Sequence, residues 1–302
     1  MVANTASAIA AQFPKFDQVL QRHFPGALPL SKYMGRTAKE LSKYGFEDEN
    51  TMGMIAICRD EQTDPLYESV VRYWGKTFNC CSLAGFVTMG KTGLAAAMAH
   101  TPIQEGLRRF VFYAMPHIAI SRNGEIGRIY REGVEAPSHA CGALETIVEE
   151  LAAGHLNLET DMQDIEQTIV RQKILSQLRY GDQVNLVDLT QLSSKIIATD
   201  VRNLLSRLDT TVFHYAVMHG IQIHGPFESQ WVYPVDFFIV GKQFGDQPYG
   251  LDTFTRNTRD RHSSPNSDKL PGHNLTPAPA PESPKSPKSS SASDNTGTPS
   301  QD

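Results

Sequence analysis

The stretch Met52-Gly-Met-Ile-Ala-Ile-Cys58 decides the fold class of this chain. It is a short apolar run that ends abruptly in the charged triplet Arg59-Asp60-Glu61. Such a run is typical of a buried strand. Asp64-Pro65 follows and predicts the start of a helix, with Asp at the N-cap and Pro in the first turn. The sequence therefore predicts a buried strand that leads into a helix.

The alternation of strands and helices continues along the chain. Further strands are predicted at residues 83–89, 109–121, 127–131, 212–218, 221–224 and 232–240. Further helices are predicted at residues 6–22, 91–100, 141–153, 161–178 and 187–208, and one begins near Thr37, where Thr37-Ala-Lys-Glu40 has capping-box spacing. Asn123-Gly124 predicts a hairpin turn. This pattern predicts an α/β fold with a mostly parallel central sheet flanked by helices.

Composition and charge argue against several classes of protein. Hydrophobic residues make up 40% of the 302 residues, so a sizeable core is available. The net charge is -5 and the basic residues are scattered, whereas nucleic-acid binding needs clustered Lys and Arg. No segment approaches the roughly 20 apolar residues that span a bilayer. The N-terminus lacks the basic and apolar regions of a secretion signal, so we expect a soluble, cytoplasmic protein.

Three regions of different character divide the chain. We expect an N-terminal helical segment at residues 1–45, an α/β domain at residues 46–250 and a disordered tail at residues 251–302. From Ser263 onward the sequence consists largely of Pro, Ser, Lys, Thr, Asp and Asn. Such a composition cannot bury enough apolar surface to offset the entropy of ordering the chain.

Two of the four cysteines lie where chemistry is expected, and four are too few for a disulfide framework in a chain of this length. Cys58 stands at the carboxyl end of a predicted strand, the edge at which open α/β sheets bind ligands. Cys141 precedes a predicted helix, whose positive dipole end stabilises a thiolate. Cys141 therefore suits a metal ligand or a nucleophile. The alternatives are a buried thiol that finishes a strand and a small residue packed at a helix start.

His117 lies inside an apolar strand, where histidine is commonly a hydrogen-bonded core residue rather than a ligand. His139, two residues before Cys141, is a competing ligand. Two Cys and one His form a known catalytic zinc pattern, in which the fourth position is left for water. If Cys80 or Cys81 supplied a fourth ligand, the site would be structural.

Three segments together resemble the limiting-CO2-inducible protein B/C family, a theta-type carbonic anhydrase class close in fold to the β-type enzymes. They are Ile57-Cys58-Arg59-Asp60-Glu61, Met115-Pro116-His117 and Ser138-His139-Ala140-Cys141-Gly142-Ala143, and the similarity runs from about Phe24 to Gly241. The resemblance implies a β-carbonic-anhydrase-like fold and a homodimer. It also implies a zinc ion held by Cys58, His117 and Cys141, and reversible hydration of CO2 to bicarbonate.

The catalytic residues carry over with one departure from the β-type pattern Cys-x-Asp-x-Arg. Asp60 matches the aspartate, but Gln62 stands where the arginine would be. Arg59 adjoins Asp60, so we expect Arg59 to hold Asp60 ionised while Asp60 orients the attacking water. His100 and His139 are candidate proton shuttles because imidazole titrates near neutral pH.

Two other functions remain open from the sequence. The first is an inactive, zinc-binding scaffold or CO2-linked regulator, for which the missing arginine at position 62 leaves room. The second is an enzyme that uses Cys141 as a nucleophile with a nearby histidine base and no metal. Metal analysis and a CO2 hydration assay distinguish the three.

The composition of the tail generates a test. A chain shortened to end at Asp260 should keep its melting temperature, because the residues removed cannot contribute to a core. Thermal unfolding of the shortened and full-length chains measures this. A large loss of stability would show that the tail contains an ordered element.

Overall fold

An α/β sandwich organises the chain in the computed structural model, which describes residues 3–131, 133–154, 159–179, 181–244 and 249–250. The predicted tail at 251–302 lies outside these residues and stays a prediction. In the described part, no helix combines the length and the apolar character needed to cross a membrane.

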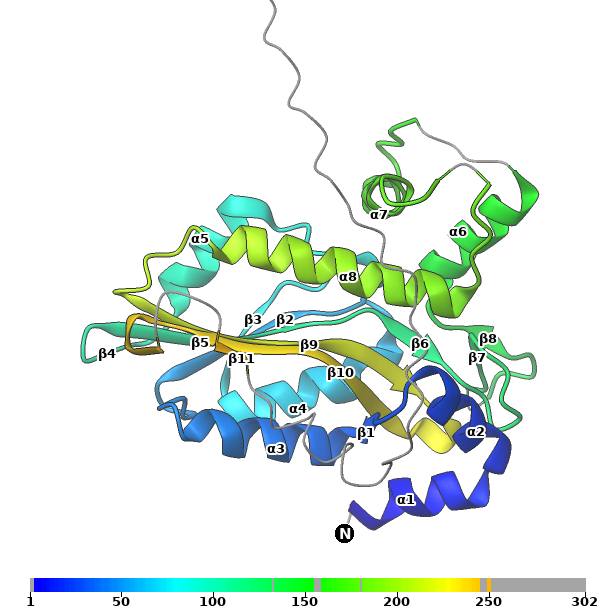
Figure 1. Ribbon diagram of the computed structural model, residues 1–302, viewed down its shortest axis with the longest axis horizontal. Coiled ribbons are helices and arrows are strands. Elements are labelled where there is room, and N and C mark those ends of the chain that lie inside the picture. Colours follow the sequence, from blue (N-terminus) through cyan, green and yellow to red (C-terminus); the bar gives the residue numbers. More distant parts are fainter. Residues whose placement is uncertain (1–2, 132, 155–158, 180, 245–248, 251–302) are drawn as a thin grey trace, which may run out of the picture. The chain divides into compact units, whose positions relative to one another are not determined.

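The central sheet is mostly parallel, as predicted (Figure 1). Its strand order is β1 (Leu28–Pro29), β10 (Gln230–Val240), β9 (Phe213–His224), β5 (Leu107–Ala114), β2 (Thr51–Ala56) and β3 (Lys76–Asn79). The pairs β2–β3, β2–β5 and β5–β9 are parallel, whereas β10 runs antiparallel to β9 and to β1.

Short strands extend or flank this sheet. β6 (His117–Ala119) pairs parallel with the end of β9. β4 (Ile103–Gln104) and β11 (Tyr249–Gly250) pair antiparallel with β5 and β10. β7 (Arg128–Ile129) and β8 (Ser138–His139) form a separate two-stranded sheet.

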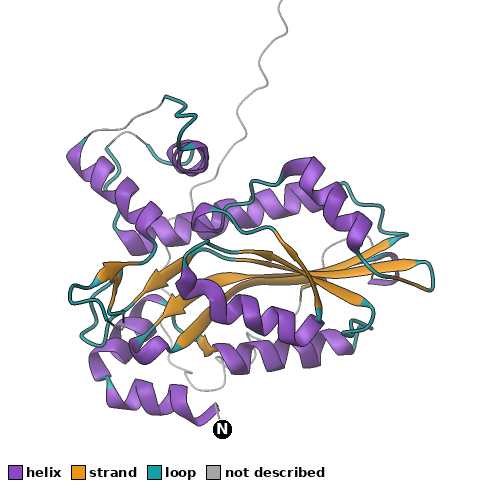
Figure 2. Cartoon of the chain, turned by 180° about the vertical axis from the view of Figure 1, so that it is seen from behind, coloured by secondary structure: helices purple, strands orange, loops and turns teal. Residues whose placement is uncertain are grey.

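Helices cover both faces of the sheet, and Figure 2 shows the strands enclosed between two helical layers. The described helices are α1 (Ala3–Gln12), α2 (Pro14–His23), α3 (Leu30–Ser42), α4 (Asp64–Trp74), α5 (Gly90–His100), α6 (Gly142–Ala153), α7 (Ile165–Leu175) and α8 (Leu186–Leu205). α3 and α4 lie on one face, and α5 and α8 lie on the other (Figure 1). Single 3-10 turns occur at Glu61–Thr63, Leu83–Gly85, Pro226–Glu228 and Lys242–Phe244.

Residues 52–56 of β2 are apolar without interruption because both faces of this strand are buried. On β2, Met54 packs in the core on the α5–α8 side, whereas Ile55 packs in the core on the α3–α4 side. Successive side chains of a strand point to opposite faces, so each strand serves both cores. α3 contributes Tyr33, Met34 and Leu41 to the second core, so part of the predicted segment 1–45 packs against the sheet.

The prediction of a strand at 83–89 is wrong. Leu83–Gly85 is a single 3-10 turn, and the strand beside β2 is instead Lys76–Asn79. Gly85 has φ +75°, and a Cβ there would lie 2.3 Å from the Met115 carbonyl oxygen. A glycine in this conformation lets the chain turn close to Met115, just past the end of β5, which an extended strand does not do.

The predicted strand at 109–121 is divided at Pro116 into β5 and β6. Proline has no N–H for the ladder, so the pairing is broken there. The Met115 N–H still donates to the Ala56 carbonyl (3.1 Å), and the Pro116 carbonyl accepts from the Gln222 N–H (3.0 Å). β5 pairs with both β2 and β9, and beyond the break only the pairing with β9 continues, through β6.

Three other predictions need smaller corrections. The helix at 6–22 breaks before Pro14 into α1 and α2, because proline is favoured in the first turn of a helix. Thr37 lies inside α3 and is fully buried, so it is not a helix cap. The strands predicted at 212–218 and 221–224 are one continuous strand, β9.

A buried hydrogen bond joins α4 to the sheet. The Trp74 indole N–H donates to the Tyr113 hydroxyl at 2.9 Å, and both side chains are almost fully buried. Burial also raises the pKa of Tyr113, so the hydroxyl stays neutral.

Replacing Tyr113 by Phe should lower the free energy of unfolding by about 1–3 kcal/mol, because the buried indole N–H loses its acceptor. Urea unfolding measures the loss, and Tyr67→Phe at a half-buried position of α4 is the control. If both variants cost the same, the Trp74–Tyr113 bond contributes nothing specific.

Candidate metal centre

Cys58 lies two residues beyond β2, in a tight turn held by Thr63. The buried Thr63 hydroxyl is 2.8 Å from the carbonyl oxygens of both Cys58 and Asp60. The Ile57 carbonyl also accepts from the Ser82 N–H at 3.2 Å. These bonds fix the backbone that carries the Cys58 thiol at the carboxyl edge of the sheet.

His117 and Cys141 are brought together by backbone bonds. His117 begins β6 directly after the break at Pro116 and is 0% exposed. The Ala119 N–H, two residues on, donates to the Ala140 carbonyl at 3.0 Å. Cys141 follows Ala140 and is the N-cap of α6, so the start of this helix is held beside β6.

The side chains of Cys58, His117 and Cys141 form a buried cluster. Their candidate ligand atoms all lie within 4.8 Å of one another. His117 Nδ1 is 2.8 Å from His224 Nε2, whereas His117 Nε2 is buried and has no hydrogen-bond partner among the described residues. A buried polar atom without a partner is costly, and a cation would supply that partner. Two sulfurs and one imidazole nitrogen form a donor set that suits zinc, so these residues fit a metal ion.

The two thiols shift each other's pKa. A hydrogen bond from Cys141 lowers the pKa of Cys58 to about 4, against the opposing effect of burial, and His117 contributes to the lowering. The same hydrogen bond raises the pKa of Cys141, and burial adds to this rise. A cation between the sulfurs would favour the thiolate form of both.

Asp60 lies beside the cluster with a side chain that is 16% exposed. Burial raises the pKa of its carboxyl group, and the neighbouring His117 imidazole opposes the rise. Its Oδ1 accepts from the Gln62 N–H at 3.0 Å and lies 3.3 Å from Arg131 Nη2. Arg131 also donates to Glu61 and to Ser138. These bonds hold its guanidinium beside the turn that carries Asp60.

The expected pairing of Arg59 with Asp60 is not what the structure shows. Arg59 Nη2 donates to Glu166 Oε1 at 2.7 Å, and the Arg59 side chain is 62% exposed. Glu166 also accepts from the Leu83 N–H at 3.0 Å, which ties α7 to the turn at Leu83–Gly85. The Asp60 carboxylate is turned toward Gln62 and Arg131, so the arginine at Asp60 comes from a residue 71 positions away.

The competing ligands from the sequence lie outside the cluster. His139 is exposed and contacts Arg128 and Glu145. His100 is exposed at the end of α5, with its ring 6.0 Å from that of Phe78. Cys80 and Cys81 are not among the three clustered residues, and burial raises the pKa of Cys80 to about 12.

The sequence did not predict His224, which contacts His117, or Arg131, which contacts Asp60. His224, at the end of β9, is 1% exposed and bonds both His117 and Gln230. Burial lowers the pKa of His224 to about 3, so its ring is neutral. In the sequence, His224 could have been found from its position at the end of the predicted strand Ile221-Gln-Ile-His. Nothing local marked Arg131.

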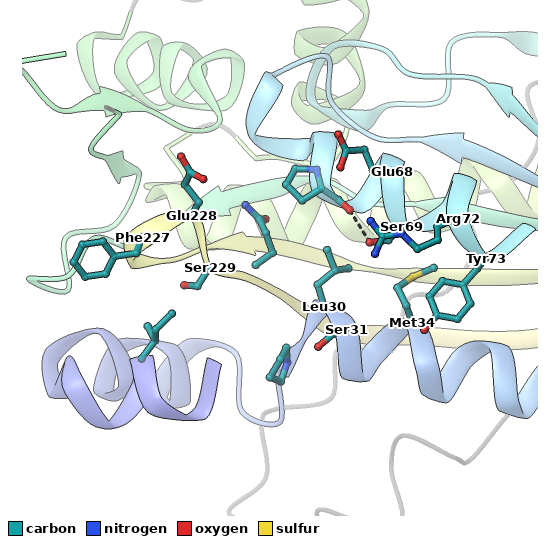
Figure 3. Close-up of a pocket in the computed structure, with 14 residues that line it drawn as sticks. Leu30, Ser31, Met34, Glu68, Ser69, Arg72, Tyr73, Phe227, Glu228 and Ser229 are labelled. Carbon is teal, nitrogen blue, oxygen red and sulfur yellow. Dashed lines mark hydrogen bonds between the residues drawn. The ribbon is translucent and has the colours of Figure 1, made fainter. Parts of the chain in front are cut away.

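Two grooves meet at Phe227, which is 71% exposed. One of about 750 Å³ is lined by Glu61 and Arg131 and therefore opens next to Asp60. The other, of about 790 Å³, lies between α3, α4 and the turn at Pro226–Glu228, as Figure 3 shows. Neither groove is lined by Cys58, His117 or Cys141. The volume of a groove therefore does not identify the metal site in this fold.

Comparisons with known proteins agree with the geometry. The family model described as limiting CO2-inducible proteins B/C beta carbonic anhydrases matches residues 27–241. The crystal structure of limiting CO2-inducible protein LCIB is 30% identical, with 78% of this chain and 97% of that chain covered and a TM-score of 0.64. PtLCIB4, a homolog of LCIB, is 26% identical, with 77% and 98% covered and a TM-score of 0.67. No curated protein sequence matches the chain significantly.

Proposed function

The chain belongs to the limiting CO2-inducible protein B/C family of β carbonic anhydrases, and from this premise we propose that it is a zinc-dependent enzyme that interconverts CO2 and bicarbonate. The observation that carries the proposal is the buried cluster of two thiols and an imidazole with an unpartnered Nε2. In this proposal Cys58, His117 and Cys141 hold the metal. Three protein ligands leave one position for water, as catalytic zinc sites do.

The chemistry divides between the metal and the surrounding residues. Cys58, His117 and Cys141 would hold a zinc ion, which would supply a Lewis acid able to lower the pKa of water toward neutrality. Asp60, two residues after Cys58, accepts a hydrogen bond from the attacking water and thereby directs the lone pair of the water oxygen toward CO2. Arg131 Nη2, 3.3 Å from Asp60 Oδ1, favours the ionised carboxylate that this task needs.

The apolar surroundings suit a substrate without charge. Ala84, Phe86 and Leu144 belong to the same apolar core as Cys58 and Cys141. CO2 has no strong polar group for a protein to bind, so it partitions into such surroundings, whereas bicarbonate does not.

A metal-binding scaffold without turnover is the second candidate. The observation in its favour is that Arg131 is shared among Asp60, Glu61 and Ser138 instead of being committed to Asp60. A cysteine-nucleophile enzyme is less well supported. Cys141 is 1% exposed, and its hydrogen bond with Cys58, together with burial, raises its pKa.

Two further features are proposed from the family. We expect a homodimer, which size-exclusion chromatography with light scattering would measure. We also expect a cytoplasmic location.

The proposed ligands predict metal content. The unmodified chain should bind about one zinc ion. Cys58→Ser and Cys141→Ser should lose it and lose stability, because metal binding is coupled to folding. Elemental analysis of purified protein measures the zinc. Cys80→Ser, which changes a buried thiol outside the cluster, should keep full occupancy. Full occupancy in Cys58→Ser would rule out this ligand set.

The proposed roles of Asp60 and Arg131 predict rates. Asp60→Asn should keep its zinc and lose about 10² to 10⁴ in CO2 hydration, the usual effect of a positioned acid–base group. Arg131→Lys should also slow the reaction, because lysine keeps the charge but loses the planar fork. Stopped-flow hydration with a pH indicator gives the rates.

Arg59→Lys is the matched control and should stay nearly as active as the unmodified protein, because Arg59 faces Glu166. Equal damage from Arg59→Lys and Arg131→Lys would contradict the assignment to Arg131. If the unmodified protein binds zinc but hydrates no CO2, the scaffold is the correct function.

A further inference from the structure

A line of hydrogen bonds, which we call the relay, runs from His117 of the cluster through three strands, β6, β9 and β10. His117 Nδ1 is 2.8 Å from His224 Nε2, and His224 Nδ1 is 2.8 Å from Gln230 Oε1. Gln222 Nε2 donates to the same Gln230 oxygen at 3.2 Å. The strand register supports this line, because His117 pairs with Gln222 and His224 pairs with Gln230.

The direction of each bond follows from the donors available. Gln230 Oε1 only accepts hydrogen bonds, so His224 Nδ1 must carry the proton. A neutral imidazole has one N–H, so His224 Nε2 is an acceptor. It therefore accepts from His117 Nδ1–H. His117 Nε2 is then left with a free lone pair, and this is the buried atom without a partner at the cluster.

These directions follow from the orientations of the Gln222 and Gln230 amides in the structure. If the Gln222 amide were reversed, its oxygen would face the Gln230 oxygen, and two acceptors cannot bond each other. If the Gln230 amide were reversed, the proton would move to His224 Nε2 and His117 would carry its proton on Nε2. That tautomer has no lone pair for a metal ion.

We propose that His224 and Gln230 are positioning residues that hold His117 in the tautomer with a free Nε2 and thereby set the affinity of the cluster for zinc. This rests on the metal site of the proposed function and adds two residues that do not touch the metal. A second hydrogen bond from a ligand histidine fixes its ring and tautomer, and losing it typically costs about 10- to 100-fold in metal affinity.

The relay also reaches the surface. Gln230 is half-buried and lines the 790 Å³ groove that contains Ser229 and Leu30 (Figure 3). Substitutions at Gln230 can therefore change the relay from its outer end without opening the core around the thiols.

The test is zinc affinity of the full chain, measured by competition with a chromophoric chelator. His224→Leu should weaken zinc binding about 10- to 100-fold. His224→Gln should recover most of the affinity, because its carbonyl oxygen can accept from His117 Nδ1–H. Gln230→Leu should weaken binding, whereas Gln230→Glu should not, because it keeps an acceptor oxygen. The Gln230 pair keeps the test decisive if His224→Leu fails to fold.

His219→Leu is the matched control for stability. His219 lies on the same strand, is 1% exposed and bonds Ser194 Oγ at 2.8 Å and the Ala114 carbonyl at 2.6 Å. It should lower the melting temperature and leave zinc affinity unchanged. Folded Gln230→Leu or His224→Leu protein that binds zinc as tightly as the unmodified chain would overturn the relay.

The readouts separate this inference from the proposed function. An unmodified protein that binds zinc tightly but hydrates no CO2 rules out the enzyme and leaves the relay standing. An active protein whose relay variants bind zinc normally overturns the relay alone. An unmodified protein without measurable zinc affinity overturns both.

Discussion

The register between the parallel strands β2 and β5 is the constraint on which the site depends. Ala56 pairs with Ala114, and the Met115 N–H continues the contact by donating to the Ala56 carbonyl. Cys58 and His117 follow within three residues of this last pair, so both emerge at one edge of the sheet. Parallel strands end together, which is why this edge collects functional groups in α/β proteins. The bond between Ala119 and Ala140 then adds Cys141 from a distant segment.

Cys58, Asp60 and His117 are each supported by a second residue. Thr63 fixes the turn behind Cys58, Arg131 faces Asp60, and His224 bonds His117. These contacts restrict the orientation of the side chains. The restriction matters because a metal ligand or an acid–base group acts only within a narrow range of orientations. Burial makes the requirement stricter, since each unsatisfied polar group in the core is costly.

The sequence predicted the fold well where apolar periodicity is strong. β2, β10, α5, α6 and α8 lie close to their predicted positions, because an apolar run buried between two helical layers leaves few alternatives. Residues 83–89 look equally apolar, but they form a turn and a loop under β5. Ala84, Phe86 and Val87 are buried in the core on the α5–α8 side, and Gly85 is needed because the Met115 carbonyl approaches so closely. Apolar content therefore predicted that this segment is buried and could not predict its conformation.

From the sequence, the family resemblance singled out Cys58, His117, Cys141 and the neighbouring Asp60. Local features alone, such as a strand end before Cys58 and a helix start after Cys141, left core packing and the competing ligand His139 open. Only the tertiary structure decided which arginine faces Asp60 and which residue orients His117. Arg131 lies 71 residues from Asp60, and His224 lies 107 residues from His117. Contacts over such separations depend on how strands and loops are brought together, and no local spacing encodes them.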